Sequence, residues 1–184
     1  MIDLEAVEDN LYQVWHDYLL EKTGREIQIL LANQDFRGLN LEYPRIMYQS
    51  IIPYSTSSNN VKEKDVVDSE DPEFDKDIEY THVIDRYITF SIEGYGEPSN
   101  QVRRLLLLLR EWFEIEELGG RFFEGYNATI VTGQIGNVQN RSTFVQNDYE
   151  DRYGFDVEIS FEDRVKVREK TIESIEINKE EVSE

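Results

Sequence analysis

The chain has 184 residues, of which 39% are hydrophobic and 12% aromatic, and its formal net charge at pH 7 is −20. A chain of this length buries roughly 70% of its unfolded surface, so the composition indicates one folded domain rather than a disordered polyanion. The negative charge disfavours sequence-reading DNA binding and anionic membranes, and the absence of cysteine excludes disulfides and cysteine-based zinc sites.

The N-terminus shows no sign of an export signal or a membrane anchor. No positively charged segment precedes an apolar run there, and the longest apolar run, residues 105–109, is far shorter than the roughly 18 residues of a spanning helix. We therefore expect a soluble protein, made in a cytoplasm and without a membrane partner.

The first predicted element is a helix over residues 3–20, followed by a short strand over residues 27–31. Apolar residues recur at three- and four-residue steps, which is typical of a helix with one buried face. Gly24 can end the helix because glycine readily takes the left-handed conformation. The apolar positions of this helix are Leu4, Val7, Leu11, Val14, Trp15 and Tyr18.

Two long extended segments, residues 43–54 and 80–95, follow and are predicted to form a hairpin whose tip projects beyond the sheet. Between them, residues 55–77 are first polar and then strongly acidic, without apolar periodicity. Loops of this length are usually functional or disordered. Two interpretations stay open: a solvated loop, or an arm that becomes ordered only against a neighbouring subunit.

A second helix is predicted over residues 98–118, with Pro98 in its first turn and Gly119-Gly120 at its end. Leu107 and Leu108 widen its apolar arc well past one face. Such a helix is covered on more than one side, either by a partner subunit or by an overfilled core of its own domain. Both explanations remain open.

The last part of the chain reads as a strand over residues 126–135, a polar connection over 136–148 and a strand over 152–165. In this last strand, Tyr153 to Phe161 alternate between an apolar and a polar side. The fold class is therefore α+β, with a mostly antiparallel sheet, two main helices packed on it, a long hairpin and a long acidic loop. We expect one domain over residues 1–178, including the extended loop 55–77, and a flexible acidic tail over 179–184.

Residues that carry out catalysis are scarce. The chain has two histidines, His16 and His82, and neither a nucleophile elbow nor a phosphate-binding loop. The carboxylates at positions 148, 150, 151 and 156 are the one candidate cluster for a hard cation, but 39 acidic residues make such clusters common by chance. We expect no enzymatic activity, no cofactor and no metal.

The acidic character permits two specific interpretations besides mere solubility. A small acidic protein can mimic DNA and thereby inhibit a DNA-binding protein. Alternatively, an acidic surface can line a ring that double-stranded DNA crosses without binding, because carboxylates do not trap phosphates as lysine and arginine do.

A resemblance to a known family rests mainly on Asp148-Tyr149-Glu150-Asp151 followed by Arg152-Tyr153-Gly154-Phe155-Asp156-Val157. This segment resembles the C-terminal strand of bacteriophage neck, or tail-terminator, proteins. The leucine-rich helix after Gly94-Tyr95-Gly96 and the leading helix also match the family's order of elements.

The resemblance implies a structural virion protein, assembled in the host cytoplasm, that forms a ring of six copies in the neck. Such a ring terminates the tail tube, joins it to the head connector, contacts the sheath if the tail is contractile, and leaves an acidic channel for DNA. The family role includes no catalytic residues and no cofactor. The alternative is the acidic DNA mimic.

From these considerations we predict two groups of site residues. The subunit interface is predicted to include Leu107, Leu108, Asn140, Arg141, Phe144 and Tyr149. The side chains that face the channel or a neighbour are predicted to be Arg152, Asp156, Glu158 and Glu162.

Overall fold

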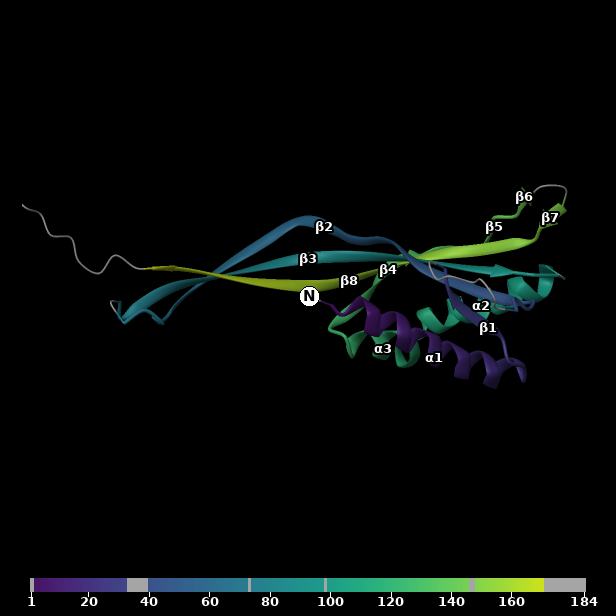
Figure 1. Ribbon diagram of the computed structural model, residues 1–184, viewed down its shortest axis with the longest axis horizontal. Helices are drawn as coiled ribbons and strands as arrows, with labels where there is room; N and C mark the ends of the chain where they lie inside the picture. Colours follow the sequence, from purple (N-terminus) through teal and green to yellow (C-terminus); the bar gives the residue numbers. More distant parts are fainter. Residues whose placement is uncertain (1, 33–39, 73, 98, 146–147, 171–184) are drawn as a thin grey trace, which may run out of the picture.

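The computed structural model describes residues 2–32, 40–72, 74–97, 99–145 and 148–170. A long, mostly antiparallel sheet carries the helices on one face of one half, and the other half extends without a helix layer (Figure 1). This arrangement confirms the predicted α+β class. The elements are α1 (Leu4–Thr23), β1 (Gln28–Leu31), β2 (Arg45–Asp68), β3 (Lys76–Tyr95), α2 (Ser99–Glu114), a π-helical turn (Glu116–Gly120), α3 (Arg121–Glu124), β4 (Ala128–Ile135), β5 (Gln139–Asn140), β6 (Thr143–Val145), β7 (Asp148–Glu150) and β8 (Arg152–Lys170).

The main sheet has the strand order β1-β2-β3-β8-β4, and β5 pairs with β8 beyond the end of β4. Only the β1–β2 pair is parallel. β3 and β8 pair without a register shift from Tyr95–Arg152 to Asp77–Lys170. β6 and β7 form a separate two-stranded sheet. The uninterrupted β3–β8 pair is therefore the central element that runs along the whole sheet.

The hydrophobic core lies between the helices and the covered half of the sheet. The Asp3 side chain caps α1 by accepting a hydrogen bond from the Ala6 N–H at 3.0 Å, and Gly24 ends the helix with φ of 67°. Trp15 of α1 meets Trp112 and Phe113 of α2 edge-on, with ring centroids 6.0 and 5.6 Å apart. Among the described helices, none is long and apolar enough to cross a membrane.

The second helix is shorter than the predicted 98–118. α2 ends at Glu114, because Ile115 takes an extended conformation and the chain then folds back through the π-helical turn and α3. A Cβ atom on Gly119 would lie 2.9 Å from both the Trp112 carbonyl oxygen and the Phe113 Cα. The glycine that was expected to stop the helix instead allows the returning chain to lie against it.

The prediction of a long loop over residues 55–77 is wrong. β2 continues to Asp68 and β3 begins at Lys76, so a short turn joins the two strands. The segment lacks apolar periodicity because most of its described side chains are exposed rather than packed in a core. Its backbone needs only a neighbouring strand for its hydrogen bonds, and β3 supplies one. The predicted hairpin is confirmed and is longer than expected.

We call the part of the sheet formed by residues 61–68, 76–84 and 163–170 the arm. It extends away from the helices as a three-stranded ribbon (Figure 1). At about 3.4 Å per residue, the arm projects about 30 Å beyond the core. We call the rest of the described chain the body. The body contains the hydrophobic core, whereas the arm is a long surface that no described helix covers.

The end of the chain differs from prediction in two places. The polar connection 136–148 contains the short strands β5 and β6 and the start of β7, and the strand predicted over 152–165 continues to Lys170 as part of the arm. The predicted tail, residues 179–184, lies outside the described residues.

Candidate assembly surfaces

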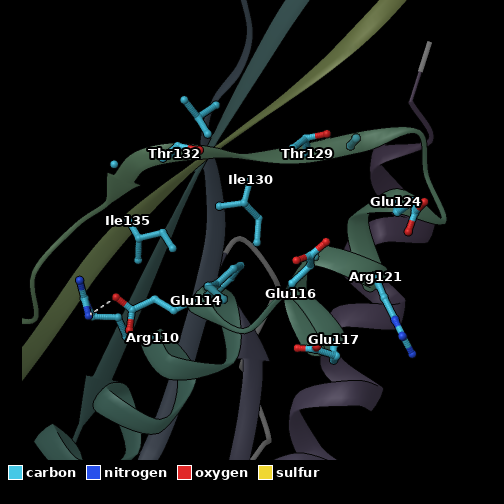
Figure 2. A pocket seen from close by; sticks show the side chains of 15 residues that line it. Arg110, Glu114, Glu116, Glu117, Arg121, Glu124, Thr129, Ile130, Thr132 and Ile135 are labelled. Atoms are coloured by element: carbon cyan, nitrogen blue, oxygen red, sulfur yellow. Dashed lines mark ion pairs between the residues drawn. The ribbon is translucent and has the colours of Figure 1, made fainter.

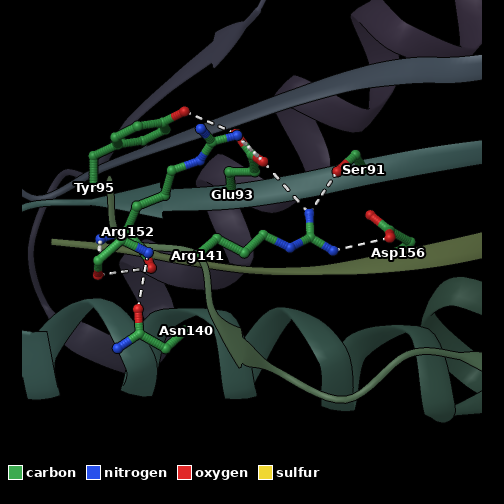
Figure 3. A network of polar contacts seen from close by, with 8 residues as sticks. Ser91, Glu93, Tyr95, Asn140, Arg141, Arg152 and Asp156 are labelled. Atoms are coloured by element: carbon green, nitrogen blue, oxygen red, sulfur yellow. Dashed lines mark hydrogen bonds and ion pairs between the residues drawn. The ribbon is translucent and has the colours of Figure 1, made fainter. Parts of the chain in front are cut away.

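A nearly buried carboxylate, Glu93 on β3, organises the sheet face opposite the helices. Its side chain accepts a hydrogen bond from the Tyr95 hydroxyl at 2.7 Å and ion-pairs with Arg141 at 3.4 Å and with Arg152 (Figure 3). The residue is 8% exposed. A carboxylate this buried is stable because cations and donors surround it.

Arg141 holds the connection after β5 against the sheet. Its guanidinium donates to the Ser91 hydroxyl at 2.9 Å and to the Asp156 carboxylate at 2.8 Å, and its backbone N–H donates to the Arg152 carbonyl at 2.7 Å. A Cβ on Gly154 would lie 3.0 Å from the Arg141 guanidinium and 2.9 Å from the Ile92 carbonyl oxygen. The glycine therefore leaves the space that the arginine side chain occupies.

The neighbouring residues strengthen the same junction. Asn140 Oδ1 accepts a hydrogen bond from the Ser142 N–H at 2.8 Å, and the Ser142 hydroxyl accepts one from the Arg152 N–H at 3.0 Å. Beyond them, Phe144 and Tyr149 are opposite each other in the β6–β7 pair, and their side chains lie outside the described part. The structure thus brings four predicted site residues together: Asn140, Arg141, Arg152 and Asp156.

The other two predicted channel residues lie farther along β8 on the same outer face. Glu158 is opposite Thr89, and Glu162 is opposite Asp85. Glu158 is half-buried, whereas Glu162 is exposed and pairs with Arg164 at 3.2 Å. No helix covers this face in the described part of the chain, so these carboxylates are available to a neighbour or to solvent.

The two predicted interface leucines of α2 differ in their surroundings. Leu107 is 47% exposed, whereas Leu108 is half-buried and packs against the hydrophobic core. Of the two explanations for the wide apolar arc of this helix, packing against the core of its own domain therefore applies to Leu108. Leu107 remains the candidate for contact with a partner subunit.

An open concavity of about 900 Å³ lies where the end of α2, the π-helical turn and α3 face β4 (Figure 2). Ile130 and Ile135 extend from β4 toward it. Its charged lining is mainly acidic, with Glu114, Glu116, Glu117 and Glu124 against Arg110 and Arg121. Arg110 is already paired with Glu114 at 2.7 Å. The concavity therefore combines apolar side chains with excess negative charge.

The histidines and carboxylates do not gather into a reaction centre among the described residues. His16 lies on the surface of α1, where its hydrogen bond and that of Gln13 hold the pKa of Asp17 below its usual range. In those same parts of the chain, no three acidic or histidine side chains are placed to hold a metal ion. The carboxylate side chains of Asp148 and Glu150 lie outside the description.

Comparison with known proteins decides the family. The family model described as phage neck terminator protein matches residues 9–184, nearly the whole chain. The chain belongs to the phage neck terminator family. A comparison with curated proteins finds no match. Membership assigns this neck terminator family member a structural role in the phage neck and a place in the virion.

The sequence did not reveal Glu93, Ser91 and Tyr95 as members of the polar network. Their positions are about 50 residues from Arg141, and only the β3–β8 register brings the two segments together. One signal was available: Gly154 interrupts an otherwise regular strand, and an isolated glycine in a strand often marks a close approach of another segment.

Proposed function

We propose that six copies of this chain close into a ring that terminates the tail tube and joins it to the head connector, with DNA passing through the centre. The observation that carries this proposal is the family match over residues 9–184, which favours a neck component over an acidic DNA mimic. The tail tube protein, the connector and, in a contractile tail, the sheath are the proposed partners.

The charge of the chain suits a channel for DNA. Six copies at −20 each carry 6 × −20 = −120 formal charges. Phosphates near an acidic wall are repelled within about one Debye length, roughly 8 Å at physiological salt. The outer face of β8, with Glu158 and Glu162, is the proposed lining of the channel.

The polar network gives the ring a rigid junction. Arg141, Arg152 and Asp156 are held by partners within the same chain, so their side chains have fixed positions at the surface. We propose that this junction, together with Phe144, Tyr149 and Leu107, contacts the adjacent subunit. Preorganised side chains lose little entropy on assembly, which favours a stable contact.

The mass of the assembly in solution tests the proposal. Native mass spectrometry of the purified chain, with and without tail tubes, should show a species of 6 × 21.8 = 130.8 kDa. Electron microscopy of the mixture should show added density at tube ends. A 21.8 kDa monomer under both conditions, with bare tube ends, contradicts the proposal.

A further inference from the structure

The arm has two chemically different faces. Antiparallel pairing places Val66 opposite Ile78, and Val167 opposite Tyr80, so these residues share one face. Glu79 and Val61 lie on the other face, because they pair with Arg168 and Val83. We call the first set the apolar stripe, and its members are Val66, Ile78, Tyr80, Val165 and Val167.

Cross-strand ion pairs run along the charged face of the arm. Glu79 is 5% exposed and accepts hydrogen bonds from Lys166 at 2.6 Å and from Arg168 at 3.0 Å. Arg168 also reaches Glu70 at 2.6 Å. The long side chains of Lys166 and Arg168 thus cover Glu79 with their stems and ion pairs.

The apolar stripe is open in the described structure. Val66, Val165 and Val167 are 64%, 43% and 44% exposed. The stripe continues the sheet face on which Phe90 and Ile88 contact the core, at the point where the helices end. A row of exposed apolar side chains on a projecting sheet is typical of a protein contact.

The charges beside the stripe identify the kind of partner. The Lys62 ammonium lies 3.6 Å from the centroid of the Tyr80 ring, and Lys64 is opposite Tyr80 on the same face. On the same face, Asp68 at the tip is paired with Lys76, Glu169 is across from Ile78, and Asp163 is across from Ile84. Lys62 and Lys64 therefore border the β2 side of the stripe, and this side fits an apolar surface with an acidic rim.

The concavity on the body has the complementary character. It presents Ile130 and Ile135, and four glutamates line it against two arginines. The arm cannot reach the concavity of its own chain, because β8 runs without a register shift from Arg152 to Lys170 and would have to fold back. Only another copy can bring the two surfaces together.

We propose that the apolar stripe of the arm docks into the acidic concavity between α2, α3 and β4 of a second copy of this chain. The proposal rests on the ring proposed above and adds a second pair of surfaces, beside the polar junction and Leu107, that join neighbouring subunits. The arm then links each copy to the next by apolar contact in the centre and lysine–glutamate attraction at the edge.

Disulfide trapping between two singly substituted chains tests this contact, since the natural chain has no cysteine. We would mix Val167→Cys chains with Thr132→Cys chains and oxidise the mixture, because Thr132 lines the concavity and is exposed. Val61→Cys, on the charged face and 57% exposed, is the matched control. We expect about tenfold more mixed disulfide with Val167→Cys than with Val61→Cys, because docking raises the local concentration.

The outcomes separate this inference from the ring itself. Oligomers that form with equal mixed disulfide from both arm variants overturn the docking contact and leave the ring intact. Chains that stay monomeric throughout contradict both.

A second pair of variants identifies the occupant of the stripe. The double variant Val66→Ser/Val167→Ser should abolish oligomers, whereas Val61→Ser should retain them. Circular dichroism should show the same strand content in both variants and in the natural chain. Retained oligomers with lost tail-tube binding would assign the stripe to the tube protein and overturn the proposal. Oligomers that depend on residues 171–184 but not on the stripe valines would overturn it in favour of the C-terminal segment.

Discussion

At the scale of single residues, Gly154 and Arg141 show how a strand can accept a second layer. The strand alternates regularly around Gly154, yet the missing side chain leaves the space that the Arg141 guanidinium occupies. The arginine then joins Ser91, Glu93 and Asp156, which lie on two strands. One side chain thereby fixes the connection after β5 to the outer face of the sheet.

Replacing Arg141 with alanine should therefore lower the free energy of unfolding by about 2 kcal/mol, because a nearly buried carboxylate loses a charged donor. At this chain length the expected decrease in Tm is about 4–8 °C. Thermal unfolding monitored by circular dichroism measures it. Arg104→Ala, at an exposed position of α2, is the control and should change stability by no more than about 0.5 kcal/mol. Equal effects of the two variants would show that the network does not stabilise the fold.

At the scale of elements, the arm depends on cross-strand ion pairs where the body depends on apolar packing. Glu79 is the centre of these pairs, and the hydrogen bonds from Lys166 and then Arg168 lower the pKa of its carboxyl group. A lowered pKa in the folded state means that ionised Glu79 stabilises the arm above its ordinary pKa of 4.5. That stabilisation is lost as the pH falls through the lowered value.

Acidification from about pH 6 to about pH 3 should therefore open the arm before the body. Hydrogen exchange, corrected for the intrinsic rates, should become faster in residues 77–83 and 163–168 than in α1 and α2. In Glu79→Gln the arm should already exchange faster at the higher pH, and acidification should accelerate it less. The same acid response in both proteins would show that Glu79 is not the titrating group.

At the scale of the whole molecule, α2 packs one surface on the core, and we propose that another surface contacts a neighbouring subunit. The prediction from sequence treated Leu107 and Leu108 together, but Leu108 contacts the core and Leu107 is 47% exposed. Leu107 can therefore become buried in a subunit contact without a change in the fold.

Leu107→Ser should therefore reduce the ring population in native mass spectrometry and leave urea unfolding of the monomer within about 0.5 kcal/mol. Leu108→Ser should instead destabilise the monomer by about 1–2 kcal/mol, because the lost apolar side chain is half-buried. Each variant serves as the control for the other. An undiminished ring in Leu107→Ser would remove this residue from the interface.

The amino-acid sequence was sufficient to predict the α+β class, the two main helices, the hairpin and the buried face of β8, because apolar periodicity indicates which side of each element meets the core. The family resemblance, carried by residues 148–157, was also readable and is confirmed by the match over residues 9–184. The arm could not be predicted from the sequence. Residues 55–68 form a strand because they pair with β3, and their own residues show no strand pattern. Tertiary structure also decided the polar network around Glu93, because strand register joins positions that the chain separates by about 50 residues.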